Sequence, residues 1–194
     1  TAGQEVTFNG YGFPGGLDIS APACIRNLFL TGNSRSAIRN TSDLMLLDSQ
    51  VTENTSTTAG GGIQNTAAFI GPVFSEGVLV ADRCRIDRNH SSVLAGGISS
   101  FGDVLLTQTT LDANTSDGNG GALANNSSFG TNWIMLDACT VSRNTAAGSG
   151  GGYSGVTGYK SIGHLEAVNS TFFENSAVTS GGGILTNGPV SLTH

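Results

Sequence analysis

The sequence is poor in charge, and above all in positive charge. Its 194 residues include 8 Lys and Arg against 14 Asp and Glu, which gives a net charge of −6. Neutralising the phosphates of a nucleic acid or of an anionic membrane requires clustered Lys or Arg, and this chain has a single lysine, Lys160. We therefore exclude nucleic acid and anionic membrane surfaces as partners.

Cysteine and long apolar runs are also scarce. Cys24, Cys84 and Cys139 form no C-x-x-C pair and cannot all pair with one another, so they indicate neither a zinc site nor a disulfide framework. The longest clean apolar run, from Leu44 to Leu47, has four residues, far short of the roughly 18 needed for a membrane-spanning helix. We expect no membrane insertion of this segment.

Small and polar residues are abundant instead. Gly (29), Asn (16), Ser (22) and Thr (21) together make 88 of the 194 residues. A hydrophobic content of 38% nevertheless argues against a disordered, low-complexity chain. The composition predicts a packed fold that needs an unusual amount of glycine.

An internal repeat organises the chain. Each copy contains an apolar residue, two variable residues and an Asn, and in the last five copies a small triplet and an apolar residue follow, the latter nine residues after the Asn. Apolar residues also stand ten and eight positions before these Asn, an alternation with the period of a strand rather than of a helix. The six repeated asparagines are Asn33, Asn54, Asn89, Asn114, Asn144 and Asn175.

The repeat predicts an all-β chain folded as a parallel β-helix of about six to seven coils. The Asn-to-Asn spacings of 21, 35, 25, 30 and 31 residues fit one coil each, with loops of variable length. Equivalent residues should stack in columns, in which Asn satisfies backbone groups at a corner and Gly supplies positive φ or close approach. We expect Cys84 and Cys139, in a column of small residues, to be buried free thiols.

Two motifs carry a resemblance to a known family. Phe172-Phe173-Glu174-Asn175 is an F-x-x-N motif and Gly120-Gly121-Ala122-Leu123 is a G-G-A-[ILV] motif, and their repeated use over about residues 28–194 resembles the chlamydial polymorphic outer-membrane protein repeat, of the pectate-lyase-like superfold. The resemblance implies a right-handed β-helix that acts as a secreted or surface-displayed adhesin passenger of an autotransporter at a bacterial outer membrane.

The same resemblance bears on domain organisation. We predict one β-helix domain over residues 1–194, with a first irregular coil at 1–27 and the repeats at 28–194. The family's C-terminal translocator barrel is lacking here, and the sequence stops inside what looks like another coil. We therefore expect the chain to be a fragment of a longer one.

Parallel β-helices also carry polysaccharide lyases and hydrolases, so a catalytic site is an alternative. Asp87 and Asp112 should fall on adjacent coils about 5 Å apart, with Arg88 beside them, where two carboxylates could bind calcium or share acid–base work. The competing interpretation is a solvated ladder of ion pairs, which we favour together with no resident cofactor and no metal site. The predicted pairs are Arg88 with Glu53, Arg143 with Glu174, and Asp48 with Arg83.

The first strand of each coil is apolar on both faces. Such a strand is typical of burial on both sides. We favour coverage by the loops at 66–77, with Phe69, Ile70, Val73 and Phe74, and at 154–163, and the alternative is a partner or self-association face. The outward residues of this possible interaction stripe are Met45, Val80, Leu105, Met135 and Trp133.

These observations favour a non-enzymatic, extracellular or cell-surface module that displays loops for adhesion or assembly. Its partner would be a host or neighbouring-cell surface protein or glycan, or another copy joined through the open coil ends. A carbohydrate-active enzyme is the alternative. An ice-binding or filament-forming structural protein is less favoured. Ice binding would need ranks of outward Thr, and only Thr110, Thr140 and Thr171 stack in one file.

Overall fold

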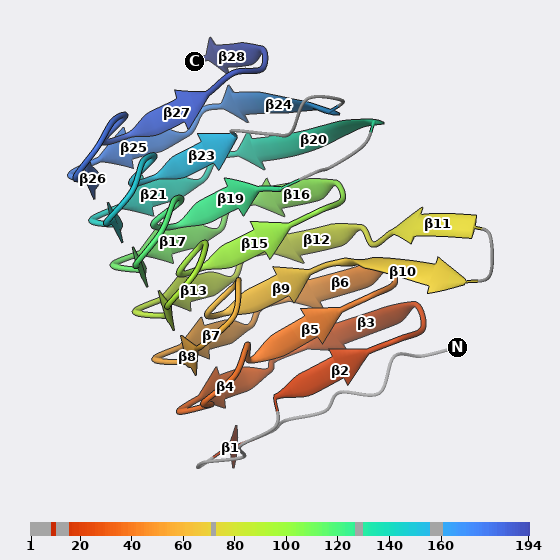
Figure 1. Ribbon diagram of the computed structural model, residues 1–194. Coiled ribbons are helices and arrows are strands. Elements are labelled where there is room, and N and C mark those ends of the chain that lie inside the picture. Colours follow the sequence, from red (N-terminus) through yellow and green to blue (C-terminus); the bar gives the residue numbers. More distant parts are fainter. Residues whose placement is uncertain (1–8, 11–15, 71–72, 127–129, 156–160) are drawn as a thin grey trace.

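The chain is a right-handed parallel β-helix, as the repeat and the resemblance predict (Figure 1). The computed structural model describes residues 9–10, 16–70, 73–126, 130–155 and 161–194, and the side chains of 9–10, 67–70, 73–76, 130 and 161 lie outside that description. Within these ranges all regular secondary structure is strand. Successive coils lie one above another, and each contributes strands to up to four parallel sheets.

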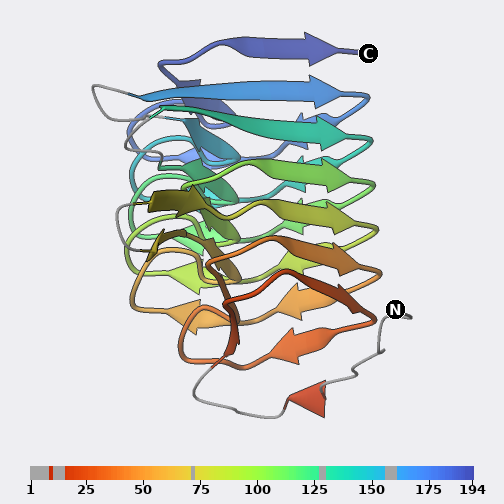
Figure 2. The same ribbon diagram turned by 90° about the vertical axis from the view of Figure 1, so that its right-hand side faces the viewer.

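Sheet 1 opens each coil and contains seven parallel strands, seen side by side in Figure 2. Its register aligns Leu44, Leu79, Val104 and Ile134, all of which are buried and face inward. The alternate residues face outward and form the stripe. The strands are β3 (Ala23–Arg26), β6 (Leu44–Leu47), β12 (Leu79–Asp82), β16 (Val104–Thr107), β20 (Gly130–Asp137), β24 (Ser161–Val168) and β28 (Val190–Thr193).

Sheet 2 follows after a tight corner and also has seven strands. Val51, Ile86 and Leu111 pair in register and face the core, where each is fully buried. The strands are β1 (Asn9–Gly10), β4 (Phe29–Thr31), β7 (Gln50–Thr52), β13 (Arg85–Asp87), β17 (Thr110–Asp112), β21 (Thr140–Ser142) and β25 (Thr171–Phe173).

Sheet 3 is short and begins one coil later than its neighbours. It has five two-residue strands, the first of which, β8, belongs to the coil of Asn54. The coil of Asn33 has no described strand at this place. The strands are β8 (Thr55–Ser56), β14 (His90–Ser91), β18 (Thr115–Ser116), β22 (Thr145–Ala146) and β26 (Ser176–Ala177).

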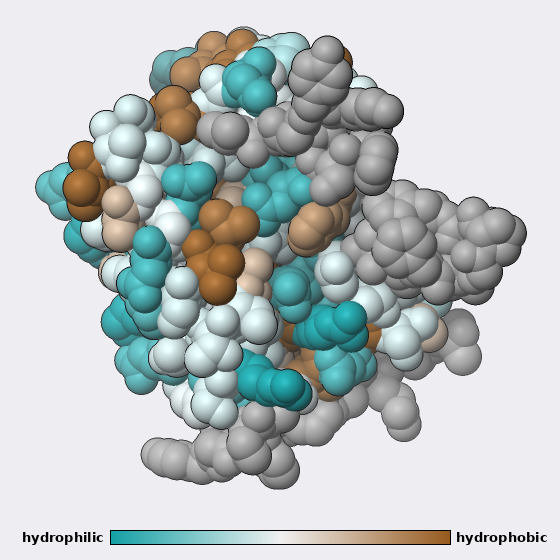
Figure 3. Space-filling view, viewed as in Figure 1, coloured by the Kyte–Doolittle hydropathy of each residue, from teal (hydrophilic) through white to brown (hydrophobic). Residues whose placement is uncertain are grey.

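Sheet 4 closes the coil, again with seven strands. Ile38, Ile63 and Ile98 form its inward file. The outward side, seen in Figure 3, shows mostly hydrophilic and neutral residues. The strands are β2 (Leu17–Ile19), β5 (Ile38–Asn40), β9 (Ile63–Asn65), β15 (Ile98–Ser100), β19 (Leu123–Asn125), β23 (Tyr153–Gly155) and β27 (Ile184–Thr186).

One excursion leaves this pattern. Strands β10 (Ala67–Ile70) and β11 (Val73–Glu76) pair antiparallel, between sheet 4 of one coil and sheet 1 of the next. The hairpin projects from the body of the helix in Figure 1 and stands beside the N-terminal ends of the sheet 1 strands in Figure 2. The extra length of this coil is therefore accommodated outside the stacked parallel sheets.

Positive φ occurs at glycines, as expected, and also at residues of other types. The first triplet residue is a Gly with positive φ in four of the five copies: Gly60, Gly120, Gly150 and Gly181. In the ranges that the structure describes, twelve non-glycine residues have positive φ. Six of them directly follow a sheet 1 strand and five directly follow a sheet 2 strand, so the left-handed conformation recurs once at each corner. A left-handed residue costs about 1–2 kcal/mol, and the tight corner between two strands imposes that cost in coil after coil. The twelfth, Ala95, is the first residue of its triplet and has a φ of 54°. The equivalent residue of the next coil, Gly120, has a φ of 71°.

Glycine is also required by close stacking between coils. A Cβ on Gly121, the second residue of its triplet, would lie 2.3 Å from the Gly151 carbonyl oxygen and 2.6 Å from the Thr145 nitrogen. A Cβ on Gly61 would lie 2.4 Å from the carbonyl oxygen of His90. The second triplet position is Gly in all five copies, and in the first four the next coil fills the space that a Cβ would need.

Candidate functional site

The six repeated asparagines form one continuous hydrogen-bonded column. The Oδ1 atom of each of the last five accepts from two groups of the preceding Asn, the backbone N–H and the side-chain Nδ2. For Asn54 these two donors lie 3.1 and 2.9 Å from Asn89 Oδ1. The Nδ2 of each of the last five also donates to the carbonyl of the preceding coil's apolar residue, such as Asn89 to Val51 at 2.9 Å.

This column is a structural device. Asn54, Asn89, Asn114 and Asn144 are fully buried, so the corner groups that they satisfy have no access to water. An amide supplies both an acceptor and two donors, which neither Asp nor Ser can match. The Asn column therefore fixes the corner through hydrogen bonds between successive coils.

A second polar column, at the corner between sheets 1 and 2, was not foreseen as hydrogen-bonded. Its hydroxyl or thiol donates to the carbonyl two residues before it, as Ser49 does to Leu47 at 2.6 Å. It also accepts from the preceding coil, since the N–H of Leu28 donates to Ser49 Oγ at 3.0 Å. The sequence signal was the recurrence of Ser, Thr or Cys five residues before each of the last five repeated Asn.

The two cysteines of this column are buried free thiols, as predicted, and Cys24 is an exposed free thiol. Cys84 Sγ and Cys139 Sγ each donate to two carbonyls at 3.3 Å. Burial raises the pKa of the Cys84 thiol to about 11 and raises that of Cys139 as well. Both thiols are protonated at neutral pH and are poor nucleophiles.

The candidate catalytic residues do lie together on sheet 2. Asp87 pairs in register with Asp112 and is fully buried, although it points away from the core. Two guanidinium groups cover its carboxylate, with Arg88 Nη1 at 2.6 Å and Arg85 Nη2 at 3.0 Å. Arg88 also binds Glu53, with 2.9 Å between Nε and Oε1.

Asp112 is held in a similar way by the next coil. Ser142 Oγ donates to Oδ1 at 2.7 Å and Arg143 Nη2 donates to Oδ2 at 2.6 Å. Burial by itself would raise the pKa of Asp112, but the hydrogen bonds from Ser142 and Arg143 and the charges of Arg143 and Arg85 outweigh it and lower the pKa. Arg143, predicted beside Glu174, is thus engaged by Asp112 instead.

The resulting arrangement favours ion pairing over acid–base work. A general acid needs a raised pKa, whereas Asp112 stays ionised at neutral pH. Among the described residues, no group of three or more His, Cys, Asp and Glu is placed to hold a metal ion. The predicted pair of Asp48 and Arg83 is present at 2.7 Å, and Arg26 joins Asp48 at 2.8 Å.

The apolar stripe runs along the outward face of sheet 1. Met45, Val80, Leu105 and Met135 pair in register on four successive strands. Met45 is 42% exposed and Trp133, two residues before Met135, is 39% exposed, while the other three are partly buried. The described part of the chain therefore leaves a row of apolar side chains open to solvent.

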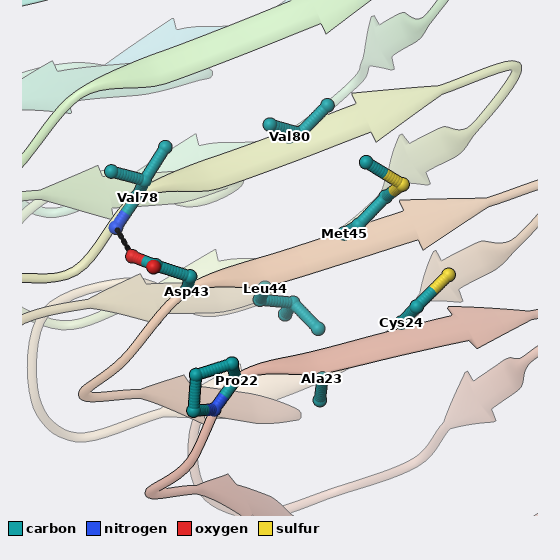
Figure 4. A pocket seen from close by; sticks show the side chains of 8 residues that line it. All are labelled: Pro22, Ala23, Cys24, Asp43, Leu44, Met45, Val78 and Val80. Atoms are coloured by element: carbon teal, nitrogen blue, oxygen red, sulfur yellow. Dashed lines mark hydrogen bonds between the residues drawn. The ribbon is translucent and has the colours of Figure 1, made fainter. Parts of the chain in front are cut away.

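The stripe deepens into a hollow at its N-terminal end (Figure 4). This hollow has a volume of about 510 Å³. Cys24, Met45 and Val80 point to one side from three successive strands, and Asp43 accepts a 3.4 Å hydrogen bond from the N–H of Val78 at its edge. Cys24 is the register partner of Met45 and so extends the stripe by one coil.

An aromatic pair marks the other end of the stripe. The rings of Trp133 and His164 stack with centroids 4.2 Å apart and an interplanar angle of 22°. The two residues are register partners on β20 and β24, so the stacked coils set this spacing. The stack gives the stripe a flat aromatic surface.

Loop coverage of the stripe stays a prediction. The side chains of Phe69, Ile70, Val73 and Phe74 lie outside those that the structure describes, as do residues 156–160.

Comparison with known proteins adds no relative. No protein-family model, no curated protein and no solved structure matches this chain. In the described part of the chain, no helix is long and apolar enough to span a bilayer.

Proposed function

We propose that the chain is a non-enzymatic recognition module of a secreted or cell-surface protein, and that the stripe on sheet 1 is its protein-binding face. The observation that carries the proposal is the solvent exposure of Met45 and Trp133 within a row of apolar residues on successive coils. Exposed apolar surface gathered in one row is uncommon on monomers and typical of interaction sites. Stacked strands also make a stiff platform that loses little entropy on binding.

The rim of the stripe indicates the chemistry of the partner. Asp43 and Asp103 lie along one side of it, directly before β6 and β16. Asp82 and Asp137 lie along the other side at equivalent strand positions, where Arg83 pairs with Asp82 and Arg26 occupies the same file. The chain as a whole carries a net charge of −6. The complementary surface is an apolar patch flanked by Lys or Arg on another protein.

The charge cluster of sheet 2 supports a binding role over an enzymatic one. Asp87 is covered by two guanidinium groups, and the lowered pKa of Asp112 opposes proton donation. Together with the motif resemblance, this favours an adhesin-like module displayed at a bacterial outer membrane.

The binding face can be tested with matched substitutions of exposed valines. Fluorescently labelled chain would be applied to panels of cultured animal cells and of bacteria, and bound fluorescence measured against concentration. We expect saturable binding that Val78→Glu, beside the stripe, weakens about tenfold or more, because burying an unpaired charge at an interface is costly. Val93→Glu, at a valine 47% exposed in the loop after β14, should leave binding unchanged.

Two results would contradict this proposal. One is absence of saturable binding, or equal loss in both variants. The other is depolymerisation of an acidic polysaccharide, with or without calcium, that Asp112→Asn abolishes, since that result would establish the enzymatic alternative.

A further inference from the structure

Two arginines differ from all the others in having no partner among the described side chains. Of seven arginines, the five at positions 26, 83, 85, 88 and 143 form ion pairs with carboxylates. Arg35 and Arg39 form no ion pair or hydrogen bond with any described side chain, and both are exposed. Both line the same hollow, which lies away from the stripe.

The hollow lies where the first repeat is short. The apolar residue Ile38 lies five positions after Asn33, whereas Ile63 lies nine positions after Asn54. The shorter chain carries Arg35 and Ser36 in place of the loop and the sheet 3 strand of later coils. The longer loop of the next coil contributes Thr58 to the wall of the hollow.

The base of the hollow is a row of polar side chains on sheet 4. Asp18, Arg39 and Gln64 are register partners on β2, β5 and β9. In Figure 3 the strongly hydrophilic surface of this face gathers over β2 and β5. Ser36 is buried, and its Oγ donates to the carbonyl of Ala59 at 3.1 Å, which ties the two coils together at this point.

The volume and the lining suit one small polar ligand. The hollow measures about 330 Å³, within the range of about 300–1,000 Å³ for small-molecule sites. A guanidinium fork matches a carboxylate in a bidentate geometry and is less strongly hydrated than an ammonium. The lining contains two guanidinium groups, of Arg35 and Arg39, and one carboxylate, of Asp18. The hollow therefore has a local excess of positive charge, although the chain as a whole is acidic.

The remaining groups fit hydroxyls rather than a second charge. Asp18 can accept hydrogen bonds from hydroxyl groups, Gln64 can both donate and accept, and Thr58 adds another hydroxyl. We propose that this hollow binds a carboxylate-bearing sugar unit, whose carboxylate lies between Arg35 and Arg39 and whose hydroxyls face Asp18 and Gln64. The ligand class is thus an acidic saccharide.

This site is separate from the stripe in position and in chemistry. The stripe lies on sheet 1 and would take an apolar protein surface, whereas the hollow lies on sheet 4. Loss of one therefore leaves the other intact, and their tests are independent.

The test is titration of the whole chain with four probes: glucuronate, glucose, acetate and sulfate. Isothermal calorimetry or chemical shifts would report binding at low salt, because ionic contacts between exposed groups are screened at high salt. We expect glucuronate to bind and the other three to bind at least about tenfold more weakly, since none of them offers both a carboxylate and ring hydroxyls.

Matched variants assign the site. Arg35→Gln and Arg39→Gln should each weaken glucuronate binding about tenfold or more, and Arg26→Gln, which removes an exposed arginine elsewhere, should leave it within about twofold. Circular dichroism would check that each variant keeps its fold, which the exposure of all three side chains favours.

Three outcomes would overturn the proposal. Failure of glucuronate to bind excludes the ligand. Acetate or sulfate binding as tightly as glucuronate reduces the site to a general anion contact. Unchanged affinity in both Arg35→Gln and Arg39→Gln places any binding elsewhere.

Discussion

The backbone N–H of Asn89 and its side-chain Nδ2 both donate to one atom, Asn114 Oδ1, at 3.0 and 3.1 Å. One oxygen thus satisfies two donors from the coil before it, and the same geometry recurs through the column. The stability of the corner therefore depends on an Asn in every coil. Replacing an Asn in the middle of the column should cost more stability than replacing one at its end.

Asn89→Ala should destabilise the chain by about 2–4 kcal/mol, because it leaves the N–H of Asn54 and the carbonyl of Val51 buried without their partner. Asn33→Ala is the matched control, since no described group donates to its Oδ1, and should cost about 1 kcal/mol. Urea unfolding measures both free energies. Equal costs at the two sites would contradict a cooperative column.

Gly121→Ala should cost about 3 kcal/mol or more, because the new Cβ would lie 2.3 Å from the Gly151 carbonyl oxygen. Gly182→Ala changes the equivalent glycine of the last triplet, where the nearest atom is 3.1 Å away, and should cost less than about 1 kcal/mol. Thermal or urea unfolding distinguishes the two. A large penalty at Gly182 would show that another coil packs on it in solution.

Asp112→Asn should reduce stability at neutral pH by about 1–3 kcal/mol, since Arg143 and Ser142 lose an ionised acceptor. The folded pKa of Asp112 lies below the ordinary value of 3.8, so its contribution is complete above that pH and disappears as the pH falls through the folded pKa. The penalty should therefore shrink in acid.

The measurement is urea unfolding of the wild type and of Asp112→Asn at several pH values between neutral and strongly acidic. Asp137→Asn, at an exposed carboxylate on sheet 1, controls for the change in net charge. A penalty that stays constant down to strongly acidic pH would show that the interaction does not require the ionised carboxylate.

One thiol should react in the native chain and three in the unfolded chain. Cys24 is exposed, whereas Cys84 and Cys139 are buried with raised pKa values. Titration with a maleimide at neutral pH, before and after addition of urea, counts them by mass. In Cys24→Ser the native count should fall to zero, and modification of a buried thiol without urea would contradict this packing.

The fold could be predicted because its signals are periodic. Apolar residues ten positions before each Asn predicted one inward file, and the register of Leu44, Leu79, Val104 and Ile134 confirms it. Each coil repeats the same evidence for a strand, so a weak local preference is reinforced over the whole chain.

The corner conformations could not be read in the same way. Arg83 and Gln108 hold φ of 51° and 47°, values that their residue types do not favour. Stacking and the hydrogen bonds of the neighbouring coils impose these angles, and a local pattern of residue types contains no such information.

The candidate sites were predictable in position and less so in contacts. Spacing placed Asp87 beside Asp112, but a long side chain such as Arg143 can reach several carboxylates, and the register alone does not choose among them. The hollow of Arg35 and Arg39 had a visible signal, the short first repeat. What distinguishes the two arginines is that the other five form ion pairs, and the sequence does not show which arginines are paired.

The common register has an evolutionary consequence. Equivalent strands of successive coils pair in register, so duplication or deletion of the DNA for one whole coil preserves each column of stacked residues. Insertion or deletion of half a coil would interrupt the columns. The length of such a rod can thus be inherited in steps of one coil, while the loops between sheets 4 and 1 diverge independently.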